Sequence, residues 1–124
     1  RKAIDNDTWP LEIVNKNTCI VDDPSSSLYN TIQSIADLPK SVSYDPIGKT
    51  LTNTANVLIF IEHNGNGYSS ENVVKGRGSV ITICGKTNAL KATAGCVDIS
   101  STNMNKLIKK LDYTRNPVIK ISAI

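Results

Sequence analysis

Two cysteines in the second half of the chain are the residues best suited to covalent chemistry. Cys96 follows Gly95 within the segment TAGCV, and Cys84 stands twelve residues before it. A glycine beside a cysteine lets a substrate approach the backbone closely, and successive backbone N–H groups there can stabilise an oxyanion. The thiolate is the reactive form of cysteine, so this segment favours nucleophilic attack on a carbonyl group. The same Gly-Cys pair is also typical of a buried structural cysteine.

The rest of the composition disfavours several other kinds of site. Three cysteines are too few for a disulfide scaffold, they lack the C-x-x-C spacing of zinc sites, and His63 is the only histidine. We therefore expect no metal site. The net charge of +3 comes without an arginine cluster, which disfavours nucleic acid as a partner. The longest apolar run, Val57 to Ile61, is far shorter than the ~18 residues that span a bilayer.

The elements that position the cysteines can be predicted from the hydrophobic pattern. The segment from Ala55 to Glu62 is apolar and rich in β-branched residues, which predicts a central strand. Asn-Gly pairs follow it, and Gly78 to Cys84 predicts a second strand that pairs antiparallel with the first. Cys96 to Ile99 is expected to be extended and to lead into a helix capped by Ser100 or Ser101. The apolar face of that helix comprises Met104, Leu107, Ile108 and Leu111.

The flanking segments predict shorter elements. We expect strands at Leu11 to Val14 and Thr18 to Val21, a helical turn between Ser25 and Lys40 that closes at Pro39, and a final strand at Val118 to Ser122. At 124 residues, the chain has room for a single domain, residues 1–124. The expected fold class is mainly β with one or two short helices.

Several segments, in order, resemble one protein family. The run GSVITICGKTNALKATAGCVDIS resembles the signature of the L,D-transpeptidase (YkuD) family, in the branch written approximately as G-S-x-I-F-x-H, a loop, then (S/T)-x-G-C-(V/I). The matching residues are Gly78, Ser79, Ile81, Thr93, Gly95, Cys96 and Val97. Upstream, CIVDDPSSSLYN resembles the W-V-D-D-P-x-S-x-x-Y-N segment of that branch, and VLIFIEHN resembles its apolar strand ending in Y-N.

The resemblance implies a partial YkuD-like β-sandwich or barrel-like domain that acts on peptidoglycan. In that family a cysteine attacks a carbonyl of a tetrapeptide stem, forms a thioester and passes the acyl group to an amine, without a cofactor. By position, the resemblance assigns the nucleophile to Cys96, the oxyanion donors to the backbone at Gly95 and Cys96, and a base-orienting hydroxyl to Thr93. The implied partners are peptidoglycan stem peptides, and the implied location is the periplasm or cell envelope of a bacterium.

One position departs from the family pattern. The general base of the family is a histidine twelve residues before the nucleophile, and that position is Cys84 here. His63 is expected not to replace it, because antiparallel pairing would place it roughly 20 Å from Cys84, beyond the ~3 Å reach of a base. Two adjacent thiols share no ready proton acceptor, so Cys84 is a poor base. A disulfide between Cys84 and Cys96 is the alternative in an oxidising compartment.

The family's upstream segment, with its T-P-x-G motif and early strands, has no counterpart here, and the chain begins with Arg1. We therefore expect an N-terminally truncated domain or a fragment. Three functions stay open. The first is an L,D-transpeptidase-type cysteine acyltransferase. The second is a catalytically inactive homologue, either a pseudoenzyme or a peptidoglycan-binding remnant, and the third is a small secreted binding module of another class.

Overall fold

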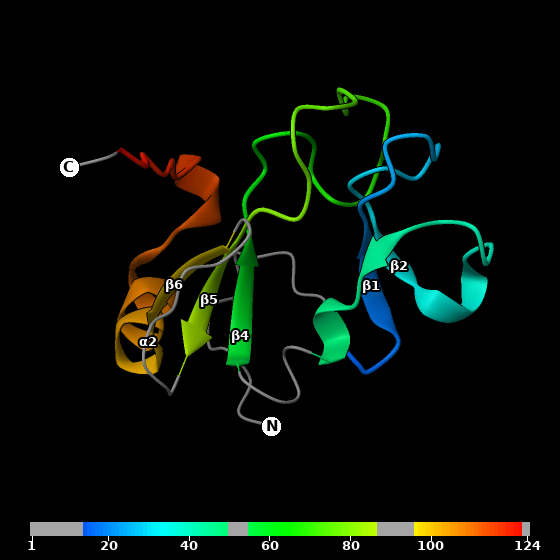
Figure 1. Cartoon of the computed structure of the whole chain (residues 1–124). Helices are drawn as coiled ribbons and strands as arrows, with labels where there is room; N and C mark the ends of the chain where they lie inside the picture. The colour runs from blue at the N-terminus through cyan, green and yellow to red at the C-terminus, as the bar shows by residue number, and fades with distance from the viewer. Residues whose placement is uncertain (1–13, 50–54, 87–95, 123–124) are drawn as a thin grey trace.

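Two three-stranded sheets form the framework of the protein (Figure 1). The computed structural model describes residues 14–49, 55–86 and 96–122. The first sheet is antiparallel, has the order β2-β1-β3, and consists of β1 (Thr18–Val21), β2 (Ile32–Ser34) and β3 (Tyr44–Asp45). The second sheet has the order β4-β5-β6 and consists of β4 (Ala55–Phe60), β5 (Thr82–Lys86) and β6 (Cys96–Ser100). Its central strand β5 runs antiparallel to β4 and parallel to β6.

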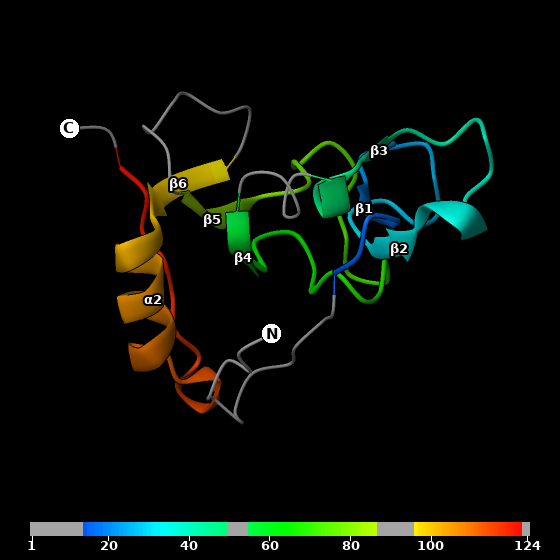
Figure 2. The ribbon, with the colours of Figure 1, turned by 90° about the horizontal axis from the view of Figure 1, so that it is seen from below.

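The helix α2 (Ser101–Lys110) packs against the second sheet (Figure 2). The Ser100 hydroxyl begins the helix by accepting a hydrogen bond from the Asn103 N–H at 3.2 Å. Met104 is 1% exposed and lies directly over Gly85 of β5. A Cβ atom at Gly85 would come within 2.9 Å of Met104 Cβ. The absence of a side chain at Gly85 therefore lets the helix approach the strand closely.

The contact between Gly85 and Met104 also defines the two faces of β5. Side chains alternate along a strand, so Ile83 shares the helix-covered face with Gly85. Thr82 and Cys84 point to the opposite face. Ile83 and Cys84 are both buried, which shows that both faces of this central strand are covered. The continuously apolar segment predicted as the central strand is instead β4, which lies at the edge of this described sheet with residues 57–60 half-buried, so that part of the prediction was wrong.

Two buried asparagines connect the sheets with the long loop between β4 and β5. The Asn64 side chain donates to the carbonyls of Val74 and Gly78 at 3.0 and 2.8 Å, and accepts the Val74 N–H at 2.9 Å. The Asn30 amide donates to the Asn64 carbonyl at 2.6 Å and accepts the Val80 N–H at 3.0 Å. Asn30 therefore ties the turn after β1 to the segment that leads into β5.

Most of the elements predicted around the cysteines are confirmed, and so is the mainly β class. β4 and β5 pair antiparallel, with Leu58 opposite Cys84 and Phe60 opposite Thr82. The strand at Thr18–Val21 and the helix that follows Cys96 both form as expected. The helical turn before Pro39 is the 3-10 turn η1 (Ile35–Asp37). No helix in the described parts of the chain combines the length and apolar character that a membrane span requires.

The structure differs from the predictions at the start of β5, at β2 and at residues 118–122. The strand β5 begins at Thr82 rather than Gly78, because Gly78 and Val80 have φ values of 95° and 59°, far from the extended conformation of a regular strand. The strand β2 just before η1 was missed. Residues 118–122 form no strand; they follow the 3-10 turn η2 (Tyr113–Arg115) as exposed chain, with Val118 94% exposed. The strand predicted at Leu11 to Val14 lies outside the described residues except for Val14.

Substitution Asn64→Ala tests the importance of the buried amide. It would leave the Val74 N–H and the Val74 and Gly78 carbonyls without their partner, so we expect a loss of about 2–4 kcal/mol in the free energy of unfolding. The control is Asn66→Ala in the same loop, whose exposed side chain accepts only the local N–H groups of Tyr68 and Ser69 and should cost under about 1 kcal/mol. Urea unfolding followed by far-ultraviolet circular dichroism measures the free energy of unfolding of both variants. Equal losses in the two variants would contradict the structural importance of the Asn64 side chain.

Candidate functional site

The parallel pairing of β5 and β6 brings the two cysteines of interest together. Cys96 lies opposite Thr82, and Asp98 lies opposite Cys84. Paired and alternate residues share a face in such a ladder, so all four side chains lie on the face turned away from α2. The Thr82 hydroxyl oxygen lies 3.0 Å from Cys96 Sγ and 3.4 Å from Cys84 Sγ. The hydroxyl therefore contacts both sulfur atoms.

The surroundings of the two thiols favour a thiolate on Cys96. Hydrogen bonds from the Cys84 thiol and the Thr82 hydroxyl lower the pKa of Cys96 to about 6, although burial and the charges of Asp45 and Asp98 oppose this shift. The same hydrogen bond and burial raise the pKa of Cys84 well above its ordinary value. Cys84 is 2% exposed, whereas Cys96 at the start of β6 is only partly buried. The charge therefore resides on the more accessible sulfur, and the buried thiol donates to it.

The structure brings together some of the residues that were predicted to form the site. Cys96 and Cys84 are brought into contact, whereas Thr93 and Gly95 lie outside the described residues. His63 is exposed, and its Nε2 atom lies 3.2 Å from the Arg77 carbonyl oxygen, near Gly78. The expectation that His63 lies beside the beginning of the 78–84 segment is confirmed. Its ring is held by the loop rather than by the thiols.

Thr82 is a member of the site that the sequence reasoning missed. It occupies the aromatic position of the G-S-x-I-F-x-H pattern, so the resemblance directed attention away from it. The usable signal was its spacing from Cys84, because residues i and i+2 of a strand lie on the same face. Asp98 could have been found in the same way from Cys96. Both Asp98 carboxylate oxygens are shielded from solvent.

Two further groups affect the electrostatics of the site. The Asp45 carboxyl of β3 has a raised pKa because it is partly buried and close to Asp22. Its charge in turn raises the pKa of Cys96 and of Cys19. The thiol face of the second sheet is therefore within electrostatic reach of the first. Among the described residues, no group of three or more His, Cys, Asp and Glu side chains is arranged to hold a metal ion.

The strand register lets the thiols of Cys84 and Cys96 form a hydrogen bond but keeps their backbones too far apart for a disulfide. All three cysteines are thiols in the structure. Cys84 lies two residues beyond the partner of Cys96, so one strand spacing of ~4.8 Å and two residues of ~3.3 Å each put the Cα atoms roughly 8 Å apart. Two cysteines more than ~7 Å apart are not bridged without backbone movement. The diagonal arrangement lets the side chains lean into contact while the backbones keep them apart.

No protein-family model, curated protein or solved structure matches the chain. Its function is therefore inferred from the residues of the site and their geometry.

Alkylation by iodoacetamide across a pH series tests the thiolate assignment. We expect the rate at Cys96 to rise through a midpoint near pH 6, because the thiolate is the reacting form, while the buried Cys84 and Cys19 react slowly. Thr82→Val keeps the shape but removes the hydroxyl, and should raise the midpoint by about one unit. Peptide mapping by mass spectrometry assigns the modified residue. An unchanged midpoint in Thr82→Val would contradict the role of the hydroxyl.

Thiol counting after exposure to oxidised glutathione tests the register argument. We expect no intramolecular disulfide between Cys84 and Cys96, because the backbone separation is too large. Mass spectrometry without reduction should show three thiols, or a glutathione adduct on Cys96 alone. A loss of two mass units located on the peptides of both cysteines would show that the strands can shift enough to bridge them.

Proposed function

We propose that the protein is a cysteine acyltransferase of the L,D-transpeptidase type, with Cys96 as its nucleophile. The observation that carries the proposal is the Cys96 sulfur, which is partly exposed and receives hydrogen bonds from both Thr82 and Cys84. A thiolate of that kind needs no separate base before it attacks a carbonyl. The resemblance to the YkuD signature around Cys96 suggests the substrate class, peptidoglycan stem peptides, and hence a location in the bacterial periplasm or envelope. On this proposal, the two sheets are part of a YkuD-like β-sandwich.

The proposed reaction has two steps. The Cys96 thiolate attacks the carbonyl carbon of a stem peptide, the C–N bond breaks, and the amine leaves with a proton taken from water, which leaves an acyl thioester on Cys96. An acceptor amine then attacks the thioester, gives up a proton to water, and releases the thiolate. Thr82 and Cys84 stabilise the thiolate before attack and after release, when the sulfur again carries the charge.

A catalytically inactive homologue is the second candidate, and a specific observation favours it. The position of the family base is Cys84, whose pKa is raised by its hydrogen bond to Cys96 and by burial. A group with such a pKa neither accepts nor releases a proton readily near neutral pH. The leaving amine would then depend on water for its proton. A peptidoglycan-binding protein that keeps a reactive thiol but turns over very slowly would have this arrangement.

Two acyl donors of different strain separate these candidates. A carbapenem opens its strained ring on attack and places little demand on proton transfer, whereas a tetrapeptide stem requires a protonated leaving amine. Under the proposed function, both donors leave a mass adduct on Cys96, and the tetrapeptide is transferred to an amine acceptor. An adduct from the carbapenem alone identifies the inactive homologue. Absence of both adducts on folded, reduced protein overturns acyl chemistry at this thiol.

Three variants provide the controls for the adduct experiment. Cys96→Ala should abolish the carbapenem adduct, and Cys84→Ala should slow its formation about tenfold, because the thiolate loses one hydrogen-bond donor. Cys19→Ala is the matched control, since Cys19 is also a buried thiol but its sulfur donates to the Gln33 carbonyl in the first sheet. It should leave the rate of adduct formation unchanged. Intact-protein mass spectrometry over time measures all three.

A further inference from the structure

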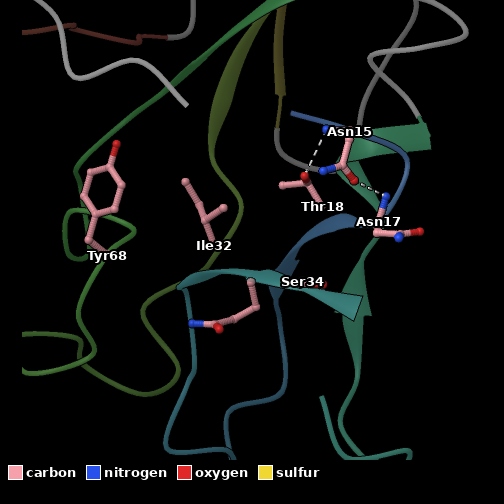
Figure 3. A pocket seen from close by; sticks show the side chains of 7 residues that line it. Asn15, Asn17, Thr18, Ile32, Ser34 and Tyr68 are labelled. Carbon is pink, nitrogen blue, oxygen red and sulfur yellow. Dashed lines mark hydrogen bonds between the residues drawn. The ribbon is translucent and has the colours of Figure 1, made fainter. Parts of the chain in front are cut away.

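A small pocket lies beside the first sheet and contains none of the thiol residues (Figure 3). Its volume is about 290 Å³, and we name it the Tyr68 pocket. Ile32 lies between the Tyr68 ring on one side and Asn15 and Thr18 on the other, as Figure 3 shows. Of the described residues that line it, none carries a charge at neutral pH. Because these lining residues offer no counter-ion, the pocket suits an uncharged ligand better than a charged one.

The backbone of β2 runs along this pocket, and the strand register defines which of its groups point away from β1. The hydrogen bonds from the Val21 N–H to the Thr31 carbonyl and from the Ile35 N–H to the Asn17 carbonyl lie at the two ends of the ladder. Bonded and non-bonded pairs alternate in an antiparallel ladder. Gln33 is therefore a bonded partner of β1.

The two residues that flank Gln33 turn their backbone groups to the open edge of the sheet. Ile32 already donates its N–H to the Gly67 carbonyl at 2.7 Å. The Ser34 carbonyl accepts the first hydrogen bond of the 3-10 turn η1, as an N-cap residue does. In the described part of the chain, the Ile32 carbonyl and the Ser34 N–H have no partner. The open edge of β2 thus offers one acceptor, the Ile32 carbonyl, and one donor, the Ser34 N–H, on either side of Gln33.

This pair of groups matches the hydrogen-bond pattern of a parallel strand. A residue added in parallel opposite Gln33 donates its N–H to the preceding carbonyl, Ile32, and accepts the following N–H, Ser34. Antiparallel addition would need both groups of one residue, and each of these two residues has only one available. The neighbours of the added residue would place their side chains on the face of Ile32 and Ser34, where the pocket lies.

We propose that the Tyr68 pocket binds an uncharged extended peptide segment by parallel strand addition to β2. Main-chain hydrogen bonds to Ile32 and Ser34 fix its direction, and the pocket accepts small neutral side chains beside Tyr68. The proposal is independent of the chemistry at Cys96, with which the pocket shares no residue.

Titration with capped trialanine, N-acetyl-Ala-Ala-Ala-amide, tests the proposal. Heteronuclear NMR should show saturable shifts at the Ser34 and Tyr68 amides. A peptide methylated at the central nitrogen lacks the donor for Ile32 and should bind about tenfold more weakly. A disaccharide of N-acetylglucosamine is the competing ligand. Shifts with the disaccharide but not the peptide, equal affinity for both peptides, or no shift at all would overturn the proposal.

Two substitutions at one position separate the backbone donor from the side chain. Ser34→Pro removes the N–H at a residue with φ of −87°, and its preceding residue is extended, as proline requires. Ser34→Ala keeps the N–H and removes only the hydroxyl. We expect the proline variant to bind capped trialanine about tenfold more weakly than the alanine variant. Equal affinities would contradict strand addition.

Two more variants complete the test. Tyr68→Ala should weaken binding by removing the wall of the pocket. Cys96→Ala should bind as the unmodified protein does, so a failure of the acyltransferase proposal leaves this one standing. Loss of peptide binding in Cys96→Ala would instead place the peptide at the thiol site. The methylated peptide tests strand addition on the unmodified protein, so the test does not depend on whether Ser34→Pro folds.

Discussion

The pair of buried asparagines, Asn30 and Asn64, is the constraint on which the remaining structure depends. The loop between β4 and β5 is long and has few apolar residues, so its backbone needs polar partners inside the protein. Asn64 supplies three such hydrogen bonds from a side chain that is 4% exposed, and Asn30 holds the Asn64 backbone in turn. Asn30 itself has φ of 58°, a conformation that asparagine tolerates better than most residues. Each of these amides would cost about 1–3 kcal/mol if left buried without a partner.

The two asparagines influence the positions of the thiols indirectly, through the residues that precede β5. The Asn30 side chain accepts the N–H of Val80, a β-branched residue with φ of 59°. This conformation is strained for valine, and it persists because the surrounding hydrogen bonds define it. The chain becomes extended at Thr82, two residues later, so the position of Val80 sets which side chains of β5 point away from α2. A network that organises a loop thus also determines where Thr82 and Cys84 meet Cys96.

The sequence predicted the elements whose pattern is local and missed those that depend on distant partners. The apolar run of β4, the cap at Ser100 and the amphipathic helix after it carry their own signals. The β2 strand is only three residues long and pairs with β1 across a turn, so nothing in its own sequence distinguishes it from the following 3-10 turn. The alternating apolar residues from Val118 to Ile121 gave a strand signal, but residues 118–122 have no strand partner in the described part of the chain. Contact between Cys84 and Cys96 followed from the resemblance, whereas the role of Thr82 required the register of β5 against β6.

Under the proposed function, a thiol at the position of the family's imidazole separates two tasks that a histidine performs together. An imidazole with a pKa near neutrality removes a proton from the nucleophile and later returns it to a leaving group. Cys84 is suited to neither transfer, because its hydrogen bond to Cys96 and its burial raise its pKa well above the ordinary value. It instead stabilises charge on its neighbour, as does Thr82. If the site acts as proposed, it attacks readily but gives the leaving group little help, so its rate should depend on the leaving group much more steeply than that of a cysteine paired with histidine.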